Sequence, residues 1–151
     1  MILLAKASDL SAKALKLALD NHDGKLDLAG NEYIFHIVQV GKYVKEVTNK
    51  DEVLKVAYLH DILEDSPVIE EDLQKKFSNE IVESVKVLTR KKNEPYSYYL
   101  ERVKANKWAT IVKLADLRHN SDLDRISNPT ERDLKRNKKY RKAIDFLTEG
   151  D

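Results

Sequence analysis

Apolar residues recur three and four positions apart along nearly the whole chain, which is the spacing of one face of an α-helix. In the first such segment Leu10, Ala14 and Leu17 fall on one side, and polar residues occupy the other. No alternating run of apolar and polar residues marks a strand. The spacing predicts helices over about 9–21, 34–47, 51–63, 68–77, 79–89, 96–105, 109–123 and 130–147. We therefore expect a compact, all-α helical bundle.

Few residues that break helices interrupt this pattern, since the 151 residues include only 4 Gly and 3 Pro. Gly24 and Gly30 mark a loop after the first helix, and Pro67 closes the third. Thr130 and Asp133 have the spacing of a capping box at the start of the last helix. With no repeat or linker along the chain, we expect a single domain over residues 1–151.

Composition and charge exclude several classes of function. The 27 Lys and Arg residues nearly balance the 26 Asp and Glu residues, so the net charge of +1 gives no general attraction to nucleic acid or to anionic membranes. The apolar start, MILLA, is too short for a signal sequence, and no stretch approaches the ~20 apolar residues of a membrane span. Cysteine is absent, so any metal must be held by histidines and carboxylates. We expect a cytoplasmic protein with no membrane partner.

The segment AYLHDILEDS (57–66) places a histidine beside an aspartate among residues that favour a core. An adjacent His-Asp pair is by itself common at helix surfaces and caps. Here, however, Leu59 and Ile62 flank His60 and Asp61, which indicates a buried helix. A buried carboxylate needs a compensating charge, a metal ion or hydrogen-bond donors.

Two other segments supply similar residues. His36 lies in the apolar segment NEYIFHIVQV, and Asp116 lies in VKLADLRHNSD. Taken singly, His36 is typical of a hydrogen-bonded core histidine and Asp116 of a helix surface. Together with His60 and Asp61, they offer two nitrogens and two carboxylates, a mixed set that suits manganese, iron or zinc.

Four segments in series carry a resemblance to a known family. HDGK (22–25), AGNEYIFHI (29–37), YLHDILEDS (58–66) and VKLADLRHN (112–120) resemble, in order and spacing, the motifs of the HD-domain metal-dependent phosphohydrolases. The likeness is to their RelA/SpoT-type branch, which removes the 3′-pyrophosphate from guanosine tetra- and pentaphosphate. It covers the motif-bearing core, about 10–125, and leaves the C-terminal helix, about 130–147, outside. It implies a single HD-type fold over the whole chain.

The resemblance also implies roles for individual residues. His36, His60, Asp61 and Asp116 match the metal ligands. Glu64 and Asp65 match the acidic pair that positions and activates the attacking water, and Asn120 matches a residue that contacts the substrate. We add Lys25, Lys113 and Arg118 as candidate phosphate contacts, because each is a cation within or beside these motifs. The expected cofactor is one divalent ion, manganese first, with iron or zinc as alternatives. The expected substrate is a nucleotide, guanosine tetraphosphate first.

Three alternatives stay open. The family loop usually has a basic residue where this chain has Asp27, so the substrate could be another nucleotide. A catalytically silent nucleotide-binding module would share the same fold, although all six central site residues are present. The basic stretch LKRNKKYRK (134–142) would suit nucleic acid, but such a stretch is more often a solvated helix face.

Overall fold

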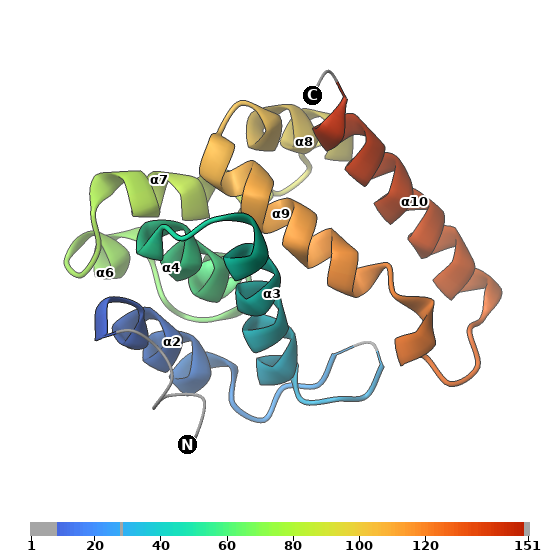
Figure 1. Ribbon diagram of the computed structural model, residues 1–151, viewed down its shortest axis with the longest axis horizontal. Coiled ribbons are helices and arrows are strands. Elements are labelled where there is room, and N and C mark those ends of the chain that lie inside the picture. Colours follow the sequence, from blue (N-terminus) through green and yellow to red (C-terminus); the bar gives the residue numbers. More distant parts are fainter. Residues whose placement is uncertain (1–8, 28, 150–151) are drawn as a thin grey trace.

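The computed structural model of the protein describes residues 9–27 and 29–149, and the side chains of residues 11–27 and 29–149 (Figure 1). The apolar MILLA run lies outside the described residues. The helices are α2 (Asp9–His22), α3 (Tyr33–Val47), α4 (Asp51–Leu59), α5 (Ile62–Asp65), α6 (Glu70–Gln74), α7 (Asn79–Val87), α8 (Tyr96–Lys104), α9 (Lys107–Asn120) and α10 (Glu131–Thr148), with a 3-10 turn η1 (Leu123–Arg125) before the last. The described part of the chain contains one isolated bridge, Leu26 to Glu32, and no strand. The all-α prediction is confirmed.

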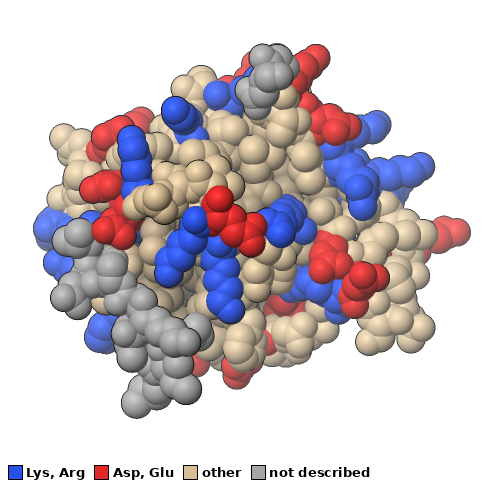
Figure 2. Space-filling model, in the orientation of Figure 1, with Lys and Arg blue, Asp and Glu red and all other residues tan. Residues whose placement is uncertain are grey.

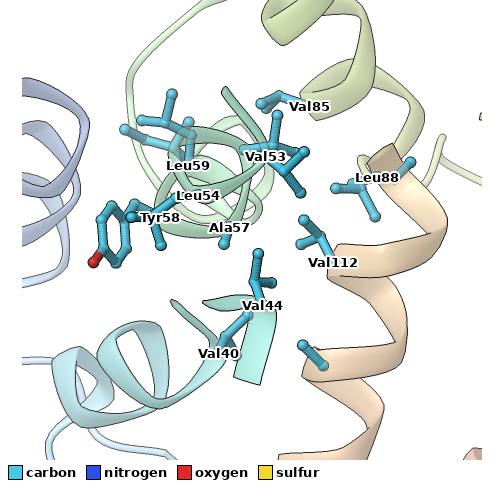
Figure 3. Close-up of a cluster of buried hydrophobic side chains, with 14 of the residues drawn as sticks. Val40, Val44, Val53, Leu54, Ala57, Tyr58, Leu59, Val85, Leu88 and Val112 are labelled. Carbon is cyan, nitrogen blue, oxygen red and sulfur yellow. The ribbon is translucent and has the colours of Figure 1, made fainter. Parts of the chain in front are cut away.

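Helix α4 lies at the centre of the fold. It packs against α2, α3, α7 and α9, while α10 lies along the outside of α9 and α8 (Figure 1). Val53 and Ala57 of α4 are fully buried and face Val44 of α3 and Val112 of α9 (Figure 3). Burial of this apolar surface is the main favourable term in folding. The three segments that carry the candidate ligands therefore converge on one rigid core.

Side-chain caps set the beginnings of several helices. Ser78 accepts a hydrogen bond from the Ile81 amide, and Asn106 accepts one from the Ala109 amide at 3.0 Å. At α10, the Thr130 hydroxyl accepts from the Asp133 amide at 3.2 Å, and the Asp133 carboxylate accepts from the Thr130 amide at 2.8 Å. This reciprocal pair is the capping box that the sequence predicts.

No described helix is long and apolar enough to cross a membrane.

The helix expected over 51–63 is interrupted, and this prediction was wrong. Helix α4 ends at Leu59, His60 and Asp61 form a turn, and α5 begins at Ile62. Asp61 has φ −105° and ψ 2°, outside the helical region. The turn brings the side chains of His60 and Asp61 to the same side of the chain. On a continuous helix, adjacent side chains would instead point about 100° apart. The segment expected as a helix over 68–77 is likewise shorter, since α6 covers only Glu70–Gln74.

Close contact between α3 and α4 depends on Gly41. A Cβ atom added there would lie 2.6 Å from Cε1 of Tyr58 and 3.3 Å from Cδ1 of Leu54. Both neighbours are buried, so neither side chain has room to move away. Gly41→Ala is therefore expected to lower the free energy of unfolding by about 1–3 kcal/mol, as overpacked cores do. Urea denaturation measures this change, and Lys42→Ala, one residue away on the exposed side, is the control. Equal stability of both variants would contradict the prediction.

Candidate metal centre

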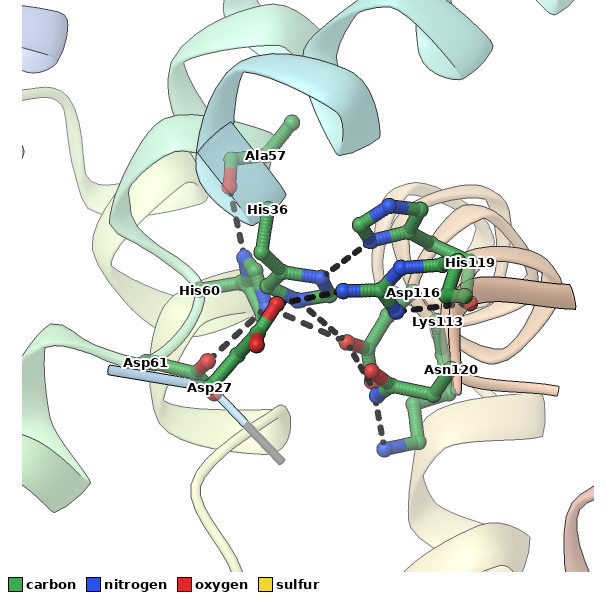
Figure 4. Close-up of polar contacts among 10 residues, drawn as sticks. Asp27, His36, Ala57, His60, Asp61, Lys113, Asp116, His119 and Asn120 are labelled. Atoms are coloured by element: carbon green, nitrogen blue, oxygen red, sulfur yellow. Dashed lines mark hydrogen bonds and ion pairs between the residues drawn. The ribbon is translucent and has the colours of Figure 1, made fainter. Parts of the chain in front are cut away.

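His60 presents an unpaired ring nitrogen in the centre of the site. Its side chain is buried, and its Nδ1 donates to the carbonyl oxygen of Ala57 at 2.7 Å (Figure 4). In the neutral ring Nε2 then carries the lone pair, and among the described residues this atom has no hydrogen-bond partner. It faces the carboxylates of Asp61 at 3.1 Å and of Asp116 at 3.4 Å. Because a lone pair and two carboxylates repel one another, this arrangement favours a cation between them.

Asp116 connects the other parts of the centre. One of its oxygens lies 2.9 Å from Nε2 of His36 and accepts from the Asn120 amide at 3.1 Å. Its second oxygen pairs with the Lys113 ammonium at 3.0 Å. Burial alone would raise the pKa of Asp116, but Lys113 and the two histidines outweigh it and hold that pKa well below its usual range. Asp116 is therefore an ionised carboxylate whose orientation is fixed by its partners.

The structure brings together the four residues predicted as metal ligands. Donor atoms of His36, His60 and Asp116 lie within 4.8 Å of one another, and this group can hold a metal ion. Asp61 contacts His60 from the other side and forms a second such group with Glu64 and Asp65. Burial, together with the negative charges of Asp116 and Asp65, raises the pKa of Asp61 well above its usual range. This excess of negative charge, beside two imidazoles, fits a divalent cation.

His119 belongs to the centre, although the sequence analysis did not single it out. Its Nδ1 lies 2.7 Å from Nδ1 of His36, and the two rings stack with centroids 4.9 Å apart. Burial, with the nearby charges of His36 and Arg125, lowers the pKa of His119 to about 4, so its ring is neutral at ordinary pH. A neutral His119 can accept a hydrogen from Nδ1 of His36, which leaves Nε2 of His36 available as a ligand. In the sequence, His119 follows Asp116 by three residues and so lies on nearly the same helix face. This spacing was the feature that could have indicated its place in the site.

His119→Ala is expected to weaken metal binding by about 10–100-fold, because partners that orient a ligating histidine have effects of this size. Titration of the metal-free protein with manganese, followed by calorimetry, measures the affinity. Arg118→Ala is the matched control, since Arg118 pairs with the exposed Glu46 at 2.7 Å and lies over Tyr43. Unchanged affinity in the His119 variant would remove this residue from the site.

The acidic pair lies on the short helix α5, beside Asp61. A carboxylate oxygen of Glu64 accepts from the backbone amide of Arg90, in the loop after α7, at 2.5 Å. Burial raises the pKa of Glu64. The backbone carbonyl of Asp65 accepts from the Lys25 ammonium, which also lies 3.3 Å from His22. Contacts to two distant loops therefore fix this pair next to the candidate ligands.

The candidate phosphate contacts differ in where they lie. Lys113 is largely buried at the centre, bound to Asp116. Lys25 lines a hollow of about 430 Å³ with Leu26, Tyr33 and Asp65. Arg118, in contrast, pairs with Glu46 of α3, so the structure does not bring it into the site.

Asp27 is held in place by an ion pair and by two backbone amides. One of its oxygens pairs with Arg125 at 2.5 Å, and the other accepts from the amides of Ala29 and Asn31, both at 2.9 Å. Arg125 also donates to the backbone carbonyl of His119 at 2.9 Å. The negative charge at position 27 is thus neutralised inside the loop, and the pair links the loop to the end of α9.

A pocket of about 300 Å³ opens over the centre. Its lining residues come from the loop, α3, α9 and α10, together with Asp61: Leu26, Asp27, Tyr33, His36, Asp61, Asp116, Asn120 and Tyr140. With the adjoining hollow beside Lys25, the size lies in the range of small-molecule sites. An organic ligand in this pocket would contact His36, Asp61 and Asp116 directly.

A known family model matches most of this chain. Residues 14–118 match the model of the HD domain, and this range includes all four candidate ligands. A solved structure described as "A metazoan ortholog of SpoT hydrolyzes ppGpp and plays a role in starvation responses" superposes with a TM-score of 0.78 and 24% identity. The match covers 95% of this chain and 88% of that one. At this identity the likeness shows the shared fold.

Curated proteins match over the same region. The guanosine-3′,5′-bis(diphosphate) 3′-pyrophosphohydrolase of Haemophilus influenzae is 30% identical over 115 residues, which is 69% of this chain and 17% of that protein. The bifunctional (p)ppGpp synthase/hydrolase SpoT of Escherichia coli is 31% identical over 119 residues, 72% of this chain and 17% of that protein. The chain thus spans about a sixth of the length of these relatives.

Proposed function

Because this chain belongs to the HD domain family, we propose that it is a metal-dependent hydrolase that cleaves a phosphoester bond of a nucleotide. The observation that carries the proposal is the buried, unpaired Nε2 of His60, which faces the carboxylates of Asp61 and Asp116. Among the described residues this nitrogen has no hydrogen-bond partner, and its lone pair is available to a metal ion.

We propose that His36, His60, Asp61 and Asp116 hold one divalent ion, with manganese as the first choice. Two imidazoles and two carboxylates also suit iron and zinc, but not calcium or magnesium, which prefer oxygen alone. A bound ion of this kind lowers the pKa of water and polarises a phosphoryl oxygen.

Glu64 is the proposed general base. Its carboxylate lies on the turn that follows Asp61, and the Arg90 amide holds one oxygen, so the other can accept a proton from water. The water oxygen forms a bond to phosphorus while the bond from phosphorus to the ribose oxygen breaks, and the proton that Glu64 accepted passes to the released ribose oxygen. Lys113, buried beside Asp116, offsets negative charge that develops on the phosphoryl group.

Guanosine tetraphosphate is the proposed substrate, with water yielding guanosine diphosphate and pyrophosphate. The four motif segments support this choice, as do the names of the Haemophilus influenzae and Escherichia coli relatives. Asp27 argues against it less strongly than the sequence indicates, because Arg125 neutralises its charge. The nearest alternative keeps this chemistry and changes the nucleotide.

A release assay tests the proposal. The protein is loaded with manganese, and pyrophosphate and phosphate are measured with guanosine tetraphosphate, GTP and a panel of other nucleotides. We expect release of pyrophosphate from guanosine tetraphosphate, which a chelator abolishes. Cleavage of another nucleotide alone would rule out guanosine tetraphosphate as the substrate, but it would leave the proposed metal-dependent hydrolysis in place. No cleavage of any nucleotide by metal-loaded protein would discard the hydrolase.

Asp27 provides a sharper test of the substrate. Asp27→Arg alone would place two arginines together and break the loop, whereas Asp27→Arg with Arg125→Asp reverses the ion pair and restores a cation at position 27. One charge pair at 4 Å contributes about 1 kcal/mol in water, so we expect the double variant to lower the KM for guanosine tetraphosphate by about fivefold. Both variants lose the acceptor for the Ala29 and Asn31 amides, and the single variant also loses the ion pair, so it is expected to be the less stable of the two. An unchanged KM in a stable double variant would show that position 27 does not contact the substrate.

A further inference from the structure

A second cavity lies away from the metal centre, between α8 and α10. Its volume is about 590 Å³, and none of its lining residues lines the pocket over the metal centre. Its apolar surface comes from Tyr96, Leu100, Ala143 and Phe146. Cavities of this size and apolar character commonly bind small organic molecules.

One edge of this cavity is a row of four lysines on α10. Lys135, Lys138, Lys139 and Lys142 follow one another at steps of three, one and three residues, which places them on one helix face. Figure 2 shows Lys and Arg side chains gathered over α10. Like charges three and four residues apart destabilise a helix unless something neutralises them.

The four ammonium groups lack protein counter-ions. Across residues 9–27 and 29–149, no carboxylate forms an ion pair with any of them. Arg136, on another side of the same helix, pairs with Asp133. Lys139 instead lies over the ring of Tyr96, with its Nζ 4.1 Å from the centroid. The cavity therefore combines an apolar floor and an aromatic ring with four lysines against a single carboxylate, Glu101, which leaves an excess of positive charge.

We propose that this cavity binds a nucleoside triphosphate at a site separate from the metal centre. The base would cover the apolar floor and the triphosphate would lie along the lysines. A fatty acid would supply a single negative charge to four cations, and inorganic phosphate chains would leave the apolar floor exposed to water. A nucleoside triphosphate satisfies both requirements.

Calorimetric titration with ATP tests the proposal on the full chain, at low salt and with EDTA present so that no metal ion takes part. We expect saturable binding that Lys138→Glu/Lys142→Glu weakens at least about tenfold, since each contact to a charged group contributes a factor of this order. The matched control is Lys42→Glu/Lys45→Glu, with the same charge change on the exposed side of α3, and its affinity should change less than about twofold. Equal weakening in both double variants would show unspecific charge attraction and overturn the proposal.

Two further variants complete the test. One shows whether binding depends on the shape of the cavity as well as on its charge, and the other shows whether binding occurs at this cavity or at the metal centre. Ser97→Trp fills the cavity from the exposed side of α8 without a charge change, and it should also weaken ATP binding at least about tenfold. Asp61→Asn should leave ATP binding unchanged. Binding that Asp61→Asn removes, or that Ser97→Trp spares, would overturn the proposal. Tighter, lysine-dependent binding of a single-stranded oligonucleotide than of ATP would assign the cavity to nucleic acid instead. Circular dichroism verifies that each variant is folded.

Discussion

Asp116→Asn is expected to lower turnover of the manganese-loaded protein by about 10³-fold or more, because it would remove a charged ligand from the proposed ion, whose charge would stabilise the transition state. Asparagine has nearly the shape of aspartate, so the effect would come from charge. Asp116 also compensates the buried Lys113. Breaking this pair is expected to lower the free energy of unfolding by up to about 3 kcal/mol.

Elemental analysis and initial rates measure the two consequences separately. Asp124→Asn, a change of the same chemistry at an exposed position, is the control and should retain both metal and activity. A folded Asp116 variant with full metal content and full turnover would show that the ion, if bound, lies elsewhere.

Glu64→Gln is expected to retain the metal ion and lower turnover by about 10²-fold or more, the usual effect of losing a general base. The base must be deprotonated to act, and burial raises the pKa of Glu64. In the unchanged protein, the rate should therefore fall on acidification at a higher pH than for an ordinary glutamate, near 4.3. The glutamine variant should lack this acidic decline.

The control for this variant is Glu80→Gln, at an exposed position of α7. Loss of metal in proportion to the loss of activity would place Glu64 among the ligands instead. A rate equal to that of the unchanged protein would assign proton transfer to another group, with Asp65 the next candidate.

The helices and the candidate ligands could be predicted from the sequence because their signals are local. Apolar spacing predicts a helix from neighbours three and four positions apart, and the capping box of α10 joins residues three apart. The candidate ligands occupy apolar segments, where an imidazole or a carboxylate needs a partner.

The remaining features depend on contacts between distant residues. His119 lies 83 residues from His36, and Arg125 lies 98 residues from Asp27, so no local pattern reveals either contact. The break at His60 and Asp61 has no glycine or proline to announce it. It depends instead on the hydrogen bond from the His60 ring to the Ala57 carbonyl and on burial among other helices.

Helix α10 supplies part of the lining of the pocket over the metal centre, and this has a practical consequence for work with truncated forms of the protein. The family match ends at residue 118, before α10 begins, yet Tyr140 lines the pocket over the metal centre and Asn137 donates to the backbone of Ser121 at 2.6 Å. A fragment trimmed to the recognised motif would lose that part of the lining and would expose apolar surface that Ala143 and Leu147 now cover. Its inactivity would then be mistaken for a missing catalytic group. The smallest fragment that could be fused to another protein or immobilised with its site intact must therefore extend through Thr148.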